Sequence, residues 1–290
     1  MKFIHTFWSK PLTSKQTSDY NTSLYTILAD YSYSCYCIKK LNQEIELYAD
    51  KLGAEMLSFL PYNKIHIIEG LEDENETFFA KLKLYALKNC ELGDALIDGD
   101  TFIQKENVLH LIKTYKDKNI DVIYAYFEPY QFTNNGEHFM KHTLNNQKTI
   151  NNSNIKFKEP YYWPQTQEEC EWMNTSLLIF NNEEVKNKYI DDQFYYQNVL
   201  QKLNLDKSHP EVILEQLFLT ILCKNFKTAP IIKDFYFDPN ANENALDIGF
   251  IHLGGAKIQT LKNVMDIIQC ENKELINQIH IQFHKYKQKQ

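Results

Sequence analysis

Two aspartates separated by one glycine follow an apolar run in the segment DALIDGDTFI, residues 94–103. Two carboxylates as close as those of Asp98 and Asp100 ionise together readily only when a positive charge lies between them. A hard divalent cation such as Mg²⁺ or Mn²⁺ takes oxygen ligands and shares its remaining positions with phosphates. The spacing therefore predicts a metal site, in which Gly99 lets the backbone approach the ligand closely. The alternative is an Asp-Gly turn that caps the helix expected from Lys105.

A second candidate lies in the segment HLGGAK, residues 252–257, where a histidine leaves a late apolar run. His252 can supply a nitrogen ligand to the same cation, and Mn²⁺ accepts mixed nitrogen and oxygen sites. Gly254 and Gly255 expose backbone N–H groups, and Lys257 adds a positive charge where a helix is expected to begin. Together these residues predict a cradle for a pyrophosphate. A glycine-rich strand-to-helix turn with a surface lysine is the alternative interpretation.

Alternating strand and helix patterns are expected to position these residues. The expected strands cover residues 2–8, 44–50, 64–68, 94–97, 120–127, 174–180 and 248–253, and the expected helices cover residues 20–41, 51–59, 77–90, 105–118, 183–204, 211–225 and 257 to the end. Such alternation predicts an α/β fold with a mostly parallel sheet flanked by helices. In open sheets of this kind ligands bind outside the carboxyl ends of the strands, and Asp98 and Asp100 fall at that edge.

Composition narrows the class of protein. The 290 residues, 43% of them hydrophobic and 24% charged, are typical of a soluble globular protein with an ample core. The net charge of −7 argues against a nucleic-acid partner. The chain has no arginine, so phosphates must be met by lysines, backbone N–H groups or a metal. The cysteines are scattered and do not have the spacing of a zinc site. The sequence shows no signal-peptide or membrane-spanning pattern. We therefore expect a cytoplasmic protein with free thiols.

The segment from residue 128 to residue 171 has little periodicity and is long for a loop in a compact domain. Such segments are usually functional or disordered. Its aromatic residues favour a ligand-facing role over disorder. These residues are Tyr130, Phe132, Tyr161, Tyr162 and Trp163.

Several motifs together resemble a known family. A helix segment with a basic residue, AKLKLYAL (80–87) with Lys81, precedes the aspartate motif, and MNTSLLIFNN (173–182) follows it. An acidic residue followed by glutamine, Glu215-Gln216, comes next. A His-x-x-Gly motif with a lysine follows in the segment 252–257. In this order the motifs resemble GT-A glycosyltransferases with a DxD motif. The resemblance is to retaining glycogenin-like and lipopolysaccharide galactosyltransferase-like enzymes and to bacterial DxD sugar-binding capsule enzymes.

The resemblance implies a single GT-A (Rossmann-like) domain over residues 1–290, with a nucleotide-binding half at 1–127 and an acceptor-side half at 128–290. It implies a retaining, hexosyltransferase-like enzyme that moves a sugar from a nucleotide-diphosphate donor, a UDP-sugar in the simplest case, to a glycan or lipid-linked glycan. Bacterial surface polysaccharide synthesis, in the cytoplasm or peripherally at the inner face of the membrane, is the expected setting.

The resemblance also implies roles for individual residues. Asp98, Asp100 and His252 would hold Mn²⁺ or Mg²⁺, and Glu215 and Asn174 would serve catalysis by facing the anomeric carbon and contacting the donor sugar. The donor would also be met by Thr6, Trp8, Asp50, Lys81, Asp98, Gly99, Gly255 and Lys257.

Two other classes stay open at this point. Asp98-Gly99-Asp100-Thr101 is similar to the nucleophile loop of haloacid-dehalogenase-like phosphatases, although that family places the loop after its first strand. A non-catalytic binding or scaffold subunit with a transferase fold is the other alternative. The sequence does not identify the donor sugar, the acceptor or the oligomeric state.

Overall fold

The chain forms two compact units. The first contains residues 1–74, 94–109 and 248–290, and the second contains residues 75–93 and 110–247. The computed structural model describes residues 1–13, 24–71, 80–128, 146–163, 172–203, 205, 213–233, 248–253 and 257–287, with backbone alone for 257–260. The single-domain organisation expected over residues 1–290 stays a prediction.

The first unit is built on four parallel strands in the order β3-β2-β1-β4. Their bounds are β1 Phe3–Phe7, β2 Ile45–Ala49, β3 Lys64–Ile67 and β4 Ala95–Ile97. All residues of β2 and β4 are buried, as expected for parallel strands covered on both faces. The helices of this unit are α1 Lys10–Thr13, α2 Leu24–Lys40, α3 Lys51–Leu57, α11 Lys257–Glu271 and α12 Lys273–Tyr286.

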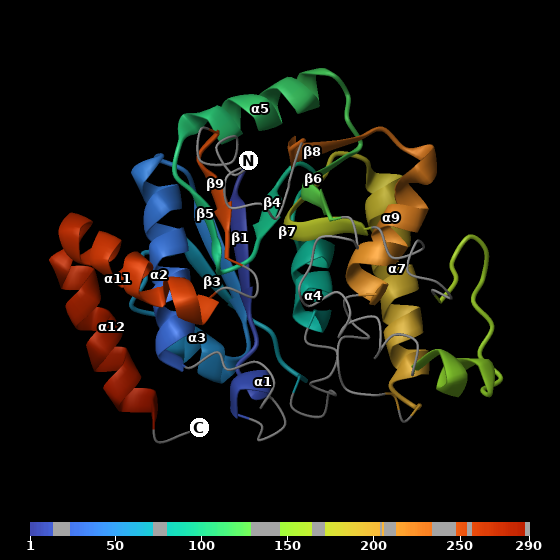
Figure 1. Ribbon diagram of the computed structural model, residues 1–290, viewed down its shortest axis with the longest axis horizontal. Helices are drawn as coiled ribbons and strands as arrows, with labels where there is room; N and C mark the ends of the chain where they lie inside the picture. The colour runs from blue at the N-terminus through green and yellow to red at the C-terminus, as the bar shows by residue number, and fades with distance from the viewer. Residues whose placement is uncertain are drawn as a thin grey trace. The chain divides into compact units, whose positions relative to one another are not determined.

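A short antiparallel pair of strands lies beside this sheet in the first unit. It consists of β5 (Thr101–Ile103) and β9 (Phe250–His252), and Thr101 is the register partner of His252. Helix α2 packs against β5, and α11 and α12 pack against α2, as Figure 1 shows at its blue and red helices. The pairing of β5 with β9 places residues 101–103 beside residues 250–252.

The second unit contains three strands in the order β7-β6-β8. Strand β6 (Val122–Glu128) pairs antiparallel with β7 (Trp172–Phe180) and parallel with β8 (Thr228–Ile232). Its helices include α4 Lys81–Asn89, α7 Glu183–Leu200 and α9 Phe218–Leu222, and α5 (Glu106–Asp117) begins in the first unit and ends in the second. The prediction of an α/β fold with mostly parallel strands and flanking helices is confirmed.

Four local features differ from the predictions, and the first is strand β5, which was not among the expected strands. The helix expected over 211–225 is, where it is described, a π-helical turn (Ile213–Leu217), the short α9 and a 3₁₀ turn (Cys223–Asn225). Strand β8 was not expected; it is an edge strand, where Pro230 is tolerated because one side needs no ladder hydrogen bond. The expected C-terminal helix is interrupted at Asn272, whose side chain caps α12 by accepting a 3.1 Å hydrogen bond from the Leu275 N–H.

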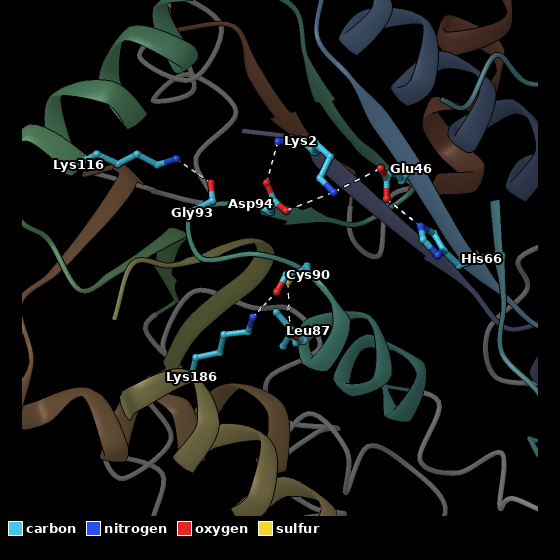
Figure 2. A network of polar contacts seen from close by, with 9 residues as sticks. All are labelled: Lys2, Glu46, His66, Leu87, Cys90, Gly93, Asp94, Lys116 and Lys186. Atoms are coloured by element: carbon cyan, nitrogen blue, oxygen red, sulfur yellow. Dashed lines mark hydrogen bonds and ion pairs between the residues drawn. The ribbon is translucent and has the colours of Figure 1, made fainter. Parts of the chain in front are cut away.

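A polar network ties together the strand starts of the first unit (Figure 2). The Lys2 N–H donates to Oδ1 of Asp94 at 2.9 Å, and the Lys2 ammonium lies 3.3 Å from Oε1 of Glu46. Nε2 of His66 lies 2.8 Å from Oε2 of Glu46. Burial works to raise the pKa of the Glu46 carboxyl, but the hydrogen bond with His66 and the charge of Lys2 outweigh it and lower that pKa. The network therefore stabilises the ionised carboxylate.

Two lysines hold the segment that leads from α4 toward β4, and both contacts lie within the second unit (Figure 2). The Lys186 ammonium donates to the Cys90 carbonyl at 2.5 Å, and the Lys116 ammonium donates to the Gly93 carbonyl at 2.7 Å. Lys186 suits its position because the last carbonyls of a helix lack intrahelical partners and carry partial negative charge, and Cys90 is the C-cap of α4. Gly93 has a φ of +82°, which glycine adopts without strain.

Among the helices in the described ranges, none combines the length and the apolar character needed to cross a membrane.

Candidate metal site

The two aspartates of the DGD motif lie on a tight turn between β4 and β5. Strand β4 ends at Ile97, and the Thr101 N–H donates to the Asp98 carbonyl at 3.0 Å, which closes a four-residue β-turn. The Leu253 N–H donates to the Asp100 carbonyl at 3.1 Å, so the turn is joined directly to the end of β9. The position at the carboxyl end of a parallel strand is the one predicted from the sequence.

Asp98, Asp100 and His252 form a group that could hold a metal ion. One ligand atom from each residue can be chosen so that the three atoms all lie within 4.8 Å of one another. Oδ2 of Asp100 is 3.6 Å from Nε2 of His252. Asp100 is buried, whereas Asp98 and His252 are half-buried. Two carboxylate oxygens and one imidazole nitrogen form a donor set suited to Mn²⁺, and the carboxylates alone suit Mg²⁺.

The structure gives Gly99 a packing role. A methyl group at this position would lie 2.2 Å from Cε2 of the Tyr31 ring, so only glycine leaves room for the ring. The Tyr31 hydroxyl donates to the Thr6 carbonyl at 2.5 Å. Burial, followed by the charges of Asp98 and Asp100, raises the pKa of Tyr31 well above its usual value. The hydroxyl therefore stays protonated and keeps donating this hydrogen bond.

Three further residues predicted to bind the donor lie on the first unit. Thr6 and Trp8 are at the end of β1, with Thr6 half-buried and Trp8 buried. Asp50 caps α3 by accepting a 3.2 Å hydrogen bond from the Gly53 N–H. It also accepts hydrogen bonds from the N–H and the hydroxyl of Ser9, at 2.9 and 2.5 Å. These contacts give Asp50 a local structural role, and contact of the three residues with a donor stays a prediction.

The pyrophosphate cradle lies largely outside the described residues. Gly254 and Gly255 are not described, and Lys257 begins α11 but only its backbone is described. Their predicted roles stay predictions.

Glu215 lies in the second unit, on the π-helical turn, where its side chain is buried. Its Oε1 accepts a 2.6 Å hydrogen bond from the Lys83 ammonium and a 2.6 Å hydrogen bond from the Thr175 hydroxyl. The Glu215 carbonyl accepts a 3.0 Å hydrogen bond from the Tyr189 hydroxyl. A buried carboxylate requires such partners, and single π-helical turns often occur at functional sites.

Lys83 is the residue that sequence reasoning missed in this group. The segment 80–87 offers two lysines on α4, and Lys81, the one chosen, is buried on the first turn of the helix. Asn174 is buried on β7, where its Oδ1 accepts a 2.9 Å hydrogen bond from the Ser176 N–H. The predicted contacts of Lys81 and Asn174 with a donor remain untested. Lys83 lies two positions after Lys81, and the sequence alone does not show which of the two lysines contacts Glu215.

The predicted ligand-facing role is wrong for Tyr161 and Trp163. Both side chains are buried, and the Tyr161 ring stacks on Phe218 at 4.7 Å between ring centroids. The Tyr161 hydroxyl donates to Oδ2 of Asp192 at 2.6 Å. These rings belong to an aromatic core cluster. Tyr162 is half-buried, and Tyr130 and Phe132 lie outside the described residues.

One family model matches nearly the whole chain. The family of unknown function (DUF6734) matches residues 1–285. No match was found among curated proteins.

Solved structures gave weaker similarities. Mouse xyloside xylosyltransferase 1, in its apo form, is similar with a TM-score of 0.40 and 10% identity over 79% of this chain and 84% of that chain. S. aureus TarS is similar with a TM-score of 0.24 and 21% identity over 43% of this chain and 21% of that chain. A structure of TarS residues 1–349 gives a TM-score of 0.26 and 15% identity over 100% and 92% of the two chains. Similarities this low carry no argument about the present chain.

Proposed function

We propose that this chain, which belongs to the family of unknown function DUF6734, is a metal-dependent glycosyltransferase. Its donor is a nucleotide-diphosphate sugar, with a UDP-sugar as the simplest case, and its acceptor is a glycan or a lipid-linked glycan. The observation that carries the proposal is the group of Asp98, Asp100 and His252 at the carboxyl end of β4. The order of motifs along the chain, which resembles that of GT-A glycosyltransferases, supports the same function.

Each residue of the group has a role in this proposal. Asp98, Asp100 and His252 hold the cation, Mn²⁺ or Mg²⁺, which supplies positive charge to neutralise a departing diphosphate. This supply matters in a chain without arginine, where Lys257 is the proposed additional cation at the diphosphate.

The catalytic carboxylate in the proposal is Glu215, and Asn174 contacts the donor sugar. A buried carboxylate can support an oxocarbenium-like transition state electrostatically or act as a nucleophile, and the second of these roles retains the anomeric configuration. Its hydrogen bonds with Lys83 and Thr175 would orient it. We place this activity in the synthesis of bacterial surface polysaccharide, in the cytoplasm or at the inner face of the membrane.

Binding measurements test the metal site first. Isothermal titration should show that Mn²⁺ binds the wild-type protein and that UDP binds much more tightly when Mn²⁺ is present. Asp100→Asn should abolish both effects while leaving the fold intact, because a turn carboxylate contributes little to a large core. Asp266→Asn, at an exposed position on α11, is the matched control and should bind like the wild type. Equal UDP binding with and without Mn²⁺ would contradict the proposal.

Product measurements then separate the enzyme classes. A panel of UDP-sugars with Mn²⁺ should yield UDP, by transfer or by slow hydrolysis, and Asp100→Asn should yield none. Release of phosphate from a phosphomonoester would instead indicate the phosphatase class. Binding of UDP and Mn²⁺ without any turnover would indicate a non-catalytic binding subunit.

A further inference from the structure

A buried serine on α2 holds the strand that follows the DGD turn. The Ser34 hydroxyl donates to the Thr101 carbonyl at 2.6 Å, and both residues are completely buried. Thr101 is the residue directly after Asp100 and is the register partner of His252. The serine therefore acts on a residue that is next to two members of the candidate metal site, Asp100 in the sequence and His252 across the strand pair.

The register of the two strands explains why Thr101 needs this donor. The Leu253 N–H donates to the Asp100 carbonyl, and the Gln104 N–H donates to the Gly249 carbonyl. In an antiparallel pair, hydrogen-bonded and non-hydrogen-bonded residue pairs alternate, so Thr101 and His252 form a non-hydrogen-bonded pair. The Thr101 carbonyl thus points away from β9 and, being buried, requires a hydrogen-bond donor from elsewhere.

A histidine and a tyrosine orient the serine. Nε2 of His5 lies 2.9 Å from the Ser34 oxygen, and Nδ1 of His5 lies 2.8 Å from the Tyr62 hydroxyl oxygen. Burial lowers the pKa of His5 to about 3, although the charge of Asp100 acts in the opposite direction, so the ring is neutral and carries one N–H. Because the Ser34 proton goes to Thr101, Ser34 accepts from His5 Nε2–H, and Nδ1 in turn accepts from Tyr62.

We propose that this relay, Tyr62 to His5 to Ser34 to the Thr101 carbonyl, is a positioning device for the metal site. It fixes the backbone at the start of β5, so that the distance between Asp100 and His252 is already set in the metal-free protein. None of the three relay side chains is a ligand; they act through the backbone of Thr101. The inference rests on the proposed metal site and names the residues that hold it in shape.

The loss of the Ser34 hydroxyl should therefore reduce the affinity for a metal ion by more than any loss of folding stability can explain. Residues that support metal ligands from behind typically change metal affinity by about 10- to 100-fold when they are removed. We expect Ser34→Ala to raise the Kd for Mn²⁺ by about tenfold, at the low end of that range because the serine acts through the backbone. Tyr62→Phe, which keeps the ring and removes the end of the relay, should weaken binding by a smaller factor.

Ser32 provides a matched control on the same helix. It is also completely buried, and no hydrogen-bond partner of its hydroxyl is found among the described residues. Ser32→Ala should therefore leave the Kd for Mn²⁺ unchanged. Isothermal titration with Mn²⁺ alone, below the unfolding temperature of every variant, gives the affinities, and thermal unfolding without metal gives the stabilities.

The outcomes distinguish this inference from the proposed function. Weaker Mn²⁺ binding in Ser34→Ala and Tyr62→Phe, with Ser32→Ala unchanged, supports the relay. Equal Mn²⁺ affinity in the wild type and all three variants overturns the relay and leaves the metal site standing. Affinity losses that simply follow the loss of stability, Ser32→Ala included, also overturn it. Absence of Mn²⁺ binding to the wild type overturns the metal site and the relay together.

Discussion

Removal of the Lys83 charge should destabilise the protein, because it leaves a carboxylate buried with too few partners. Lys83→Met keeps an unbranched side chain and removes the ammonium that lies 2.6 Å from Oε1 of Glu215. The side chains of Lys83 and Glu215 are 13% and 7% exposed, so water can replace the ammonium only in part. Breaking a buried pair by removing one partner typically costs about 3–5 kcal/mol. The Thr175 hydroxyl remains, so we expect about 3 kcal/mol, the low end of that range.

Calorimetric unfolding at neutral pH measures this loss, which corresponds to a decrease in Tm of about 6–12 °C if the unit unfolds with the per-residue entropy usual for its size. Lys88→Met, at an exposed position on the same helix, is the matched control and should change stability by at most about 0.5 kcal/mol. The double variant Lys83→Met/Glu215→Gln should lose less stability than Lys83→Met alone, because it has no stranded charge. A Tm change no larger than that of Lys88→Met, or fully additive effects in the double variant, would refute the reasoning.

Three further predictions concern single side chains. Glu46→Gln should lower the Tm at neutral pH and should lower it less at about pH 3.5. The Glu46 carboxyl has a lowered pKa in the folded state, so it stabilises the fold at pH values above its unfolded-state pKa of 4.5, and this contribution is lost as the pH falls through the folded-state pKa. A Tm difference between the two proteins that is the same at both pH values would contradict this. Gly99→Ala should destabilise the protein by about 1–3 kcal/mol in thermal unfolding, because its methyl group would overlap the Tyr31 ring; wild-type stability would show that the ring can move away. Glu215→Gln should reduce turnover of the UDP-sugar by orders of magnitude while UDP affinity barely changes, the signature of an interaction made in the transition state; near-normal turnover would assign Glu215 to the fold alone.

The sequence predicted the fold well where hydrophobic periodicity was long and regular. Helices such as α2 and α7 and the four parallel strands of the first unit lie within a few residues of their expected bounds. It failed where the local pattern was ambiguous. The apolar run from residue 213 to 222 is compatible with any helical geometry, and the π-helical turn depends on contacts with distant residues, such as the Tyr189 hydroxyl at the Glu215 carbonyl. Strand β8 contains a proline, which argues against a strand unless its edge position is known.

The sequence predicted one part of the candidate site and not the other. Asp98 and Asp100 are close in sequence, so a strand that ends before them is enough to place both at one edge of a sheet. The position of His252 beside them depends on the antiparallel pairing of β5 with β9, and neither the strand β5 nor that pairing was expected from periodicity. Partners that join distant segments through single side chains, such as Lys83 with Glu215, leave no periodic signal at all.

The charge of the site gives a physical reason for its composition. A histidine that binds a metal is neutral, so Asp98 and Asp100 give the group two negative charges, which one divalent cation balances. Around the turn, the first unit supplies neutral hydrogen-bond donors: the Tyr31 hydroxyl on the Thr6 carbonyl and the Ser34 hydroxyl on the Thr101 carbonyl. These two hydrogen bonds hold the backbone of β1 and of β5, the strand that follows the turn. In the proposed function the divalent cation then balances the charge of two carboxylates whose backbone is already fixed by neutral donors.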